Sequence, residues 1–149
     1  MALDRLERMC VKAEHCTWEM RSKMRQWRIA ENDAEQIIES LVGRRFVDDA
    51  RFARSFVHDK FSFSGWGRRR IVLELRQRRI PADTIAEAME CINPVDYEAL
   101  ALKLIRRKVA AFQQPLDYDS RLKVFRFAVG RGFEPDLVSR LLSKLKTED

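Results

Sequence analysis

The chain has 149 residues, of which 46% are hydrophobic and 35% are charged, and its formal net charge is +6. This length suits one domain or a few small repeats, and only five glycines and four prolines argue against a sandwich or barrel, which needs many turns. No apolar run approaches the roughly 20 residues that cross a bilayer, and the N-terminal residues lack a signal-peptide core. We therefore expect a soluble, cytoplasmic protein that does not contact a membrane.

Apolar side chains recur at helical spacing along the chain, in groups of three predicted helices. The predicted helical faces lie at 6–13, 20–29 and 34–41, then at 52–57, 71–80 and 85–92, and finally at 100–105, 124–133 and 138–145. The segment MRQWRI at 24–29 is close to LRQRRI at 75–80, 51 residues later. A period of about 50 residues is typical of helical repeat arrays.

These patterns predict an all-α protein of three tandem three-helix repeats, which form an elongated or curved array. We place the repeats at 1–45, 46–93 and 94–149. Each repeat is too small to bury much of its surface alone, so we expect stability to come from packing within and between neighbours. Asn32 with Glu35 three residues later predicts a helix-capping arrangement.

Positive charge is concentrated in the middle of the chain. Residues 44–79 hold eleven Lys or Arg against four Asp or Glu, a local balance of +7, so the remainder is close to neutral. Charge concentrated in this way is a property of a surface, and it favours a large anion or an acidic protein face as a partner.

A run of arginines opens the predicted helix that carries Ile71 and Leu75. If those two residues face inward, Arg69 and Arg70 point largely outward, and Arg76 follows Arg69 after two turns. Arg68 lies nearer the apolar stripe, where its stem can pack. The functional interpretation is a basic stripe for carboxylates or phosphates, which guanidinium groups contact at two points; the alternative is a solvated helix face.

Three further residues extend this candidate surface. Arg51 and Arg54 lie three apart on the preceding helix and are surface neighbours, although pairing and capping with Asp48 and Asp49 can use their charges locally. Arg79 closes the arginine-rich helix and is assigned to the same face. Two alternatives stay open for Arg51 and Arg54, partner contact and local pairing.

Aromatic residues offer a second kind of contact. Trp66, between Gly65 and Gly67, lies beside the basic stripe, where it can stack on a base or cover the seam between two helices. We expect packing, because one isolated aromatic side chain does not make a stacking platform. Trp18 and Trp27 fall on the polar side of their helix, and we expect intramolecular burial for them too.

The sequence holds no pattern typical of a catalytic or metal site. Cys10, Cys16 and Cys91 fit reduced thiols, and His15 lacks the further Cys or His pair that a tetrahedral metal site needs. His58 and Asp59 are consecutive on a helix, where side chains diverge by about 100°. We therefore expect no enzyme activity, no metal and no cofactor.

Three motifs follow one another in the middle of the chain: VDDARFAR at 47–54, Gly-x-x-Arg-Ile at 67–71 and Glu-Leu-x-x-Arg at 74–78. Together they resemble the central motif of the RecX family, whose members regulate the RecA recombinase. The resemblance is strongest over about 36 residues and extends weakly to the whole chain, because that family is also built from three tandem three-helix repeats.

One position departs from the pattern of that family, which usually has glycine before the apolar residue that closes the second helix of a repeat. Gly132 before Phe133 agrees, whereas Arg28 and Arg79 stand at the equivalent positions. Glycine there serves a left-handed helix end. Either arginine adopts that conformation at a cost of about 1 kcal/mol, or the turns differ.

The resemblance implies a modulator without catalytic residues, and we expect a monomer. Proteins of this family bind the RecA–single-stranded-DNA filament along its helical groove and restrain ATP hydrolysis, strand exchange and filament growth. On this hypothesis the seven arginines contact the filament, including its DNA. Two alternatives remain: a direct DNA-binding module of helix-turn-helix type, which needs one recognition helix, and a helical adaptor for another acidic protein.

Overall fold

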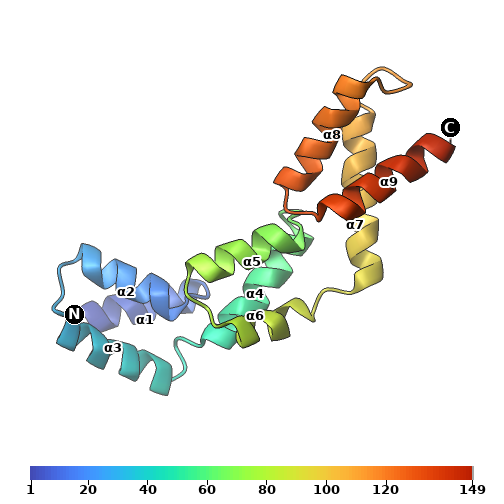
Figure 1. Ribbon diagram of the computed structural model, residues 1–149. Coiled ribbons are helices and arrows are strands. Elements are labelled where there is room, and N and C mark those ends of the chain that lie inside the picture. The colour runs from blue at the N-terminus through green and yellow to red at the C-terminus, as the bar shows by residue number, and fades with distance from the viewer. Residues whose placement is uncertain (149) are drawn as a thin grey trace. The chain divides into compact units, whose positions relative to one another are not determined.

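The computed structural model describes residues 1–148, which form nine α-helices and no strand (Figure 1). The helices are α1 (Ala2–Lys12), α2 (Thr17–Gln26), α3 (Glu31–Gly43), α4 (Asp49–Ser62), α5 (Arg68–Gln77), α6 (Ala82–Met89), α7 (Pro94–Val109), α8 (Tyr118–Gly130) and α9 (Pro135–Glu148). The all-α prediction is confirmed. Among the described residues, no helix combines the length and apolar character that crossing a membrane requires.

The helices are distributed over two compact units. Unit 1 contains Met1–Phe56 and Leu75–Ala88, and unit 2 contains Val57–Glu74 and the chain from Met89 onward. Helices α4 and α5 therefore each contribute residues to both units. The repeat boundaries after residues 45 and 93 stay a prediction, since the two units follow a different division.

The core of unit 1 is built from the apolar faces that the periodicity identified. Its buried cluster consists of Leu6, Met20, Met24, Ile38, Leu41 and Val47. Leu6 lies on α1, the two methionines lie one turn apart on α2, and Leu41 ends the inward face of α3. Three short amphipathic helices thus bury one another, because none of them is stable alone in water.

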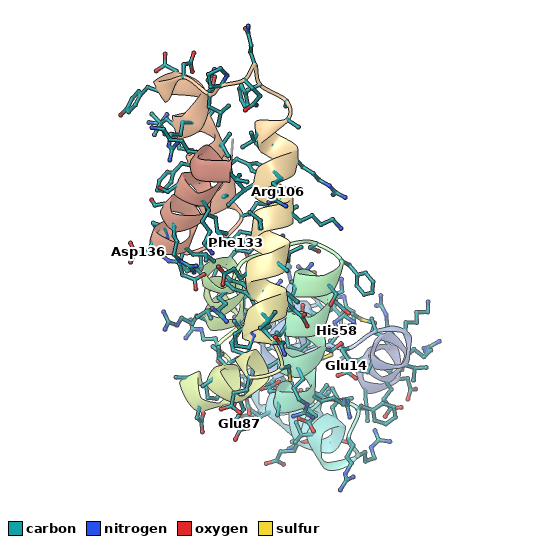
Figure 2. All side chains as sticks on the ribbon, turned by 90° about the vertical axis from the view of Figure 1, so that its right-hand side faces the viewer. Glu14, His58, Glu87, Arg106, Phe133 and Asp136 are labelled. Atoms are coloured by element: carbon teal, nitrogen blue, oxygen red, sulfur yellow. The ribbon has the colours of Figure 1, made fainter. Side chains whose placement is uncertain are left out.

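The core of unit 2 lies chiefly among α7, α8 and α9, which pack on one another. Its buried residues on these helices and the turn before α9 are Tyr97, Ala101, Ile105, Val124, Ala128, Phe133, Val138, Leu141 and Leu142. Phe133, labelled in Figure 2, lies just before α9 and is 1% exposed. Its ring centroid lies 5.4 Å from that of Tyr97.

The second helix of each trio ends in the same turn. Arg28, Arg79 and Gly132 have φ angles of 59°, 60° and 104°. In each case the next residue donates its N–H to a carbonyl five residues earlier, as Ile29 does to Met24 at 3.0 Å. This is the Schellman arrangement, in which the left-handed residue normally is glycine. The structure thus decides between the two alternatives, because both arginines adopt the left-handed conformation.

Arg28→Gly should therefore raise the free energy of unfolding by about 0.5–1 kcal/mol, because glycine adopts positive φ without the steric cost that an L-residue bears. A matched control is Arg25→Gly, inside α2, which should lower it by about 1 kcal/mol. Urea denaturation followed by far-UV circular dichroism measures both. Equal destabilisation by the two substitutions would contradict the strain at Arg28.

Helix starts agree less uniformly with the sequence patterns. Pro94 and Pro135 are the first residues of α7 and α9, where the missing N–H costs nothing. The capping prediction for Asn32 is wrong: α3 begins at Glu31, and its N-cap is Ala30, without a side-chain cap. Asn32 lies inside the first turn, so the helix starts two residues before the spacing indicated.

Candidate functional site

Arg51 stabilises the fold of unit 1. Its Nε lies 2.8 and 2.9 Å from the two carboxylate oxygens of Glu14, in the loop between α1 and α2 (Figure 2). Its Nη2 donates to the carbonyls of Arg45 and Phe46 at 3.2 and 3.3 Å. The hydrogen bond with Glu14 raises the pKa of Arg51. The Arg51 guanidinium thus pairs with Glu14, 37 residues earlier, rather than with Asp48 or Asp49 as the sequence suggested, and its contact with a partner stays a prediction.

Arg54, on the same helix, differs from Arg51. It is exposed, and no acidic partner contacts it within the described residues. The two aspartates before it act locally. Asp48 accepts the N–H of Arg51 at 3.0 Å, and Asp49 accepts the N–H of Thr17, the first residue of α2, at 2.8 Å. The aspartates of the VDDARFAR motif thus satisfy helix-terminal donors.

Arg68 is also engaged inside its unit. Its guanidinium carbon lies 3.9 Å from the centroid of the Tyr97 ring, and its Nη1 lies 3.3 Å from the carboxylate of Glu134. Its backbone N–H donates to the Tyr97 hydroxyl at 2.9 Å. The expectation that Arg68 lies nearer the apolar stripe than its neighbours agrees with these contacts.

The two arginines that follow differ from each other. Arg69 is exposed, and its backbone N–H donates to the carbonyl of Gly132 at 3.0 Å. Arg70 is half-buried, with its guanidinium carbon 4.0 Å from the Trp66 ring centroid, and Lys60 lies 4.8 Å from the same centroid. Trp66 itself is half-buried, and it holds two cations by cation–π contact. Base stacking by Trp66 stays a prediction.

Arg76 and Arg79 lie in unit 1. Arg76, in the last turn of α5, is exposed. Arg79 lines a concavity of about 310 Å³ within this unit. The complete lining is Thr17, Trp18, Arg21, Arg25, Asp49, Arg78 and Arg79. Arg21 is paired with Glu35 at 3.0 Å, whereas Arg25 is exposed and contacts no carboxylate in the described part of the chain.

The contribution of α2 to this concavity was not predicted from the sequence. Arg21 and Arg25 lie four residues apart and therefore share one helix face, which was the available signal. Their association with Arg79 had no such signal, because the residues are more than 50 positions apart. Guanidinium groups converging on one hollow favour an anionic ligand that offers carboxylate or phosphate oxygens.

Other chemistry has no support in the described residues. They contain no group of three or more His, Cys, Asp or Glu side chains that could hold a metal ion. All three cysteines are free, and burial raises the pKa of the Cys16 thiol to about 12, so it is not a reactive thiolate. His58 is exposed, and its Nδ1 lies 3.3 Å from Asp59.

Comparison with known proteins gives the family. Residues 48–89 match the profile described as "RecX, second three-helix domain", and residues 96–142 match "RecX, third three-helix domain". A protein of Pseudomonas putida (strain GB-1), "Regulatory protein RecX", is 33% identical over 141 residues, which cover 95% of this chain and 88% of that protein. The chain belongs to the RecX family.

Further relatives and solved structures agree with this assignment. A "Regulatory protein RecX" of Xanthomonas campestris pv. campestris (strain B100) is 32% identical over 95% of this chain and 85% of its own length. "Crystal structure of RecX from Lactobacillus salivarius" superposes with a TM-score of 0.79 at 17% identity, covering 98% of this chain and 97% of that one. "Crystal structure of regulatory protein RecX" superposes with a TM-score of 0.84 at 21% identity, covering 94% of this chain and 70% of that one. The two structures show the shared fold.

The RecX profiles coincide with two of the helix trios. The first matched segment spans α4 to α6 and the second lies within α7 to α9. Apart from Val47, the motif residues quoted above fall in the first segment. Asp48 and Asp49 satisfy backbone donors, and Arg51 joins two loops. These three residues of the motif therefore make contacts within the fold, whereas Arg54 is exposed.

Proposed function

We propose that this RecX-family protein binds the RecA–single-stranded-DNA filament and reduces its ATPase activity, growth and strand exchange, without catalysing a reaction itself. Membership of a family of regulatory proteins supports this function. The observation that carries it is the group of exposed arginines: Arg54 and Arg69 contact no carboxylate in the described residues, nor does Arg76. Their guanidinium groups remain available to carboxylates of the recombinase or to phosphates of its DNA.

We assign this role to only some of the seven candidate arginines. Arg51 and Arg68 are held by Glu14 and Glu134, so their replacement would disturb the fold before it disturbed a partner. The proposed contacts are therefore Arg54, Arg69, Arg76 and Arg79, together with Arg70, which packs on Trp66. Arg54, Arg76 and Arg79 belong to unit 1, and Arg69 and Arg70 belong to unit 2.

The proposed mechanism follows from binding to a polymer that has more than one geometry. A protein that lies in the groove and bridges successive protomers favours the filament geometry that it fits best, and so shifts the populations of filament states. The same position obstructs the path of incoming duplex DNA. Occupancy should therefore slow ATP turnover and strand exchange together.

Arg69→Glu/Arg76→Glu tests this proposal. The protein should slow ATP hydrolysis and strand exchange by the cognate filament, and the double variant should need at least about tenfold more protein for half the effect, because reversed charges repel the anionic target. Exposed substitutions of this kind usually change stability by less than about 0.5 kcal/mol. Steady-state ATPase assays and strand-exchange assays give the two rates.

The matched control is Lys103→Glu/Arg107→Glu, which makes the same change in net charge at two exposed positions of α7. It should act within about twofold of the unmodified protein. Equal weakening by both double variants would show a general charge effect and remove the assigned contacts. If saturating unmodified protein left both rates of the filament unchanged, the proposed function itself would be rejected.

A further inference from the structure

A second basic surface lies in unit 1 and shares no residue with the arginines assigned above. Helices α1 and α2 border a concavity of about 580 Å³. Its lining consists of Arg5, Arg8, Met9, Lys12, Lys23 and Trp27, and we call it the α1–α2 groove. Four of its six lining residues are cationic and none is acidic. All of these residues lie outside the basic segment 44–79, so the charge balance of that segment does not indicate this surface.

The geometry of α1 aligns three of these cations. Arg5, Arg8 and Lys12 occupy positions i, i+3 and i+7, which lie on one face of a helix. The rise of an α-helix places the first and last of them roughly 10 Å apart along the axis. Lys23 and Trp27, four residues apart, provide the α2 side of the groove. The result is a row of positive charge, which suits a linear polyanion.

Three acidic side chains of unit 1 form ion pairs with arginines outside the groove. Glu7 pairs with Arg44, Glu14 with Arg51 and Glu35 with Arg21. The groove cations, by contrast, contact no carboxylate within the described residues; Arg8 donates to the backbone carbonyl of Asp4 at 3.3 Å. The local distribution of ion pairs therefore leaves net positive charge in the groove.

An aromatic side chain contacts Arg5 and restricts the position of its guanidinium group. Its guanidinium carbon lies 4.3 Å from the centroid of the Trp27 ring, and Trp27 packs against the core cluster of unit 1. A cation–π contact of this kind restricts the arginine and lowers the entropy lost on binding. The flat guanidinium also offers a surface on which an unpaired base can stack.

We propose that the α1–α2 groove binds the phosphate backbone of single-stranded nucleic acid directly. Met9 and Trp27, the two apolar residues of the lining, are half-buried against the core, so neither projects as an anchor for a partner. An acidic protein partner would normally need an apolar anchor at the centre of its interface, and a membrane surface would need an apolar helix face to insert. Single-strand binding instead combines cations along a groove with stacking planes.

This inference goes beyond the proposed function, since it concerns DNA without recombinase and residues outside the assigned arginines. Fluorescence anisotropy of a labelled oligo(dT), titrated with the full chain at several salt concentrations, tests it. Arg8→Gln/Lys12→Gln should weaken binding about tenfold and reduce the slope of log K against log salt by about 1.4, because two phosphate contacts are lost. Glutamine is a good helix former, so α1 should remain folded.

The matched control is Lys103→Gln/Arg107→Gln, which removes the same two charges from α7 and should leave both affinity and slope nearly unchanged. Far-UV circular dichroism shows whether both variants fold. If Arg8→Gln/Lys12→Gln does not fold, Lys23→Gln takes its place, and the salt slope should then change by about 0.7. Equal losses in the α1 variant and its control, or displacement of the oligonucleotide by poly-glutamate at equal charge, would overturn the proposal. Unmodified protein that fails to bind oligo(dT) would do so too, while leaving filament inhibition untouched.

Discussion

Gly67→Ala should lower the free energy of unfolding by about 3–4 kcal/mol. A Cβ atom at Gly67 would lie 2.3 Å from the carbonyl carbon of Gly132 and 2.3 Å from the backbone nitrogen of Phe133. Both neighbours are backbone atoms, so no side chain can rotate away. The start of α5 would have to move away from the turn between α8 and α9, and the tight packing of unit 2 resists such a movement.

That movement would also strain two hydrogen bonds. Gly67 donates its N–H to the carbonyl of Arg131 at 2.8 Å, and Arg69 donates to the carbonyl of Gly132 at 3.0 Å. Each such bond contributes about 0.5–1.5 kcal/mol, which adds to the cost of overpacking. The expected loss is a large part of the stability of a small domain.

Urea denaturation measured by far-UV circular dichroism determines this change. Gly130→Ala is the matched control in the same unit, because a Cβ there meets nothing within 4 Å. Gly130 ends α8, where alanine should be neutral or stabilise by up to about 1 kcal/mol. A Gly67→Ala protein as stable as the unmodified chain would show that the close approach of the two backbones is not required.

Tyr97→Phe should destabilise the protein by about 2 kcal/mol at neutral pH. Tyr97 is 2% exposed. Its hydroxyl accepts the N–H of Arg68, in the first turn of α5, at 2.9 Å and donates to the carboxylate of Glu134. Helix N-terminal N–H groups have no partner within their helix. The substitution would leave that N–H without its acceptor, and Glu134 would keep only the Arg68 guanidinium as a donor.

The effect should depend on pH in one direction. Burial, and then the hydrogen bond with Glu134, raise the pKa of Tyr97 above its ordinary value. Because the folded-state pKa is the higher one, the stabilisation is fully present below the unfolded-state pKa of about 10 and is lost as pH rises toward the folded-state value. The stability difference between the unmodified protein and Tyr97→Phe should therefore fall by about 1.4 kcal/mol per pH unit above about pH 10.

Urea denaturation of the two proteins at about pH 8 and about pH 11 gives this difference in stability. Other groups that titrate in this range are present in both proteins, so their contributions cancel. Tyr118→Phe is the control, because Tyr118 is 79% exposed and its replacement should change stability by less than about 0.5 kcal/mol at either pH. A Tyr97→Phe deficit that stayed constant from neutral to alkaline pH would contradict the buried, neutral hydroxyl.

Helix class, repeat period and inward faces could be predicted because they depend on local periodicity. Met20 and Met24, Ile71 and Leu75, and Val124 are all buried as their spacing indicated. Local patterns predicted helix starts less accurately, because the position of a helix start depends on a single N-cap residue. At Asn32 the spacing suggested a capping motif, but the helix began before it.

The candidate site was less predictable, because the sequence shows which arginines exist but not which carboxylates reach them. Arg51 and Arg54 looked equivalent, yet Glu14, 37 residues earlier, contacts Arg51 alone. The groove cations on α1 were visible as a helical face, but their freedom from ion pairs depends on where Glu7 and Glu14 find partners.

The sequence by itself determined that this chain is helical, repetitive and rich in surface arginines, since each of these properties follows from composition and from spacing within one helix. Only the tertiary structure decided which arginines stabilise the fold and which remain exposed. It also decided why Gly67 must lack a side chain, since the atoms that exclude one belong to Gly132 and Phe133. Such contacts join residues far apart in the chain, and they exist only once the helices have packed.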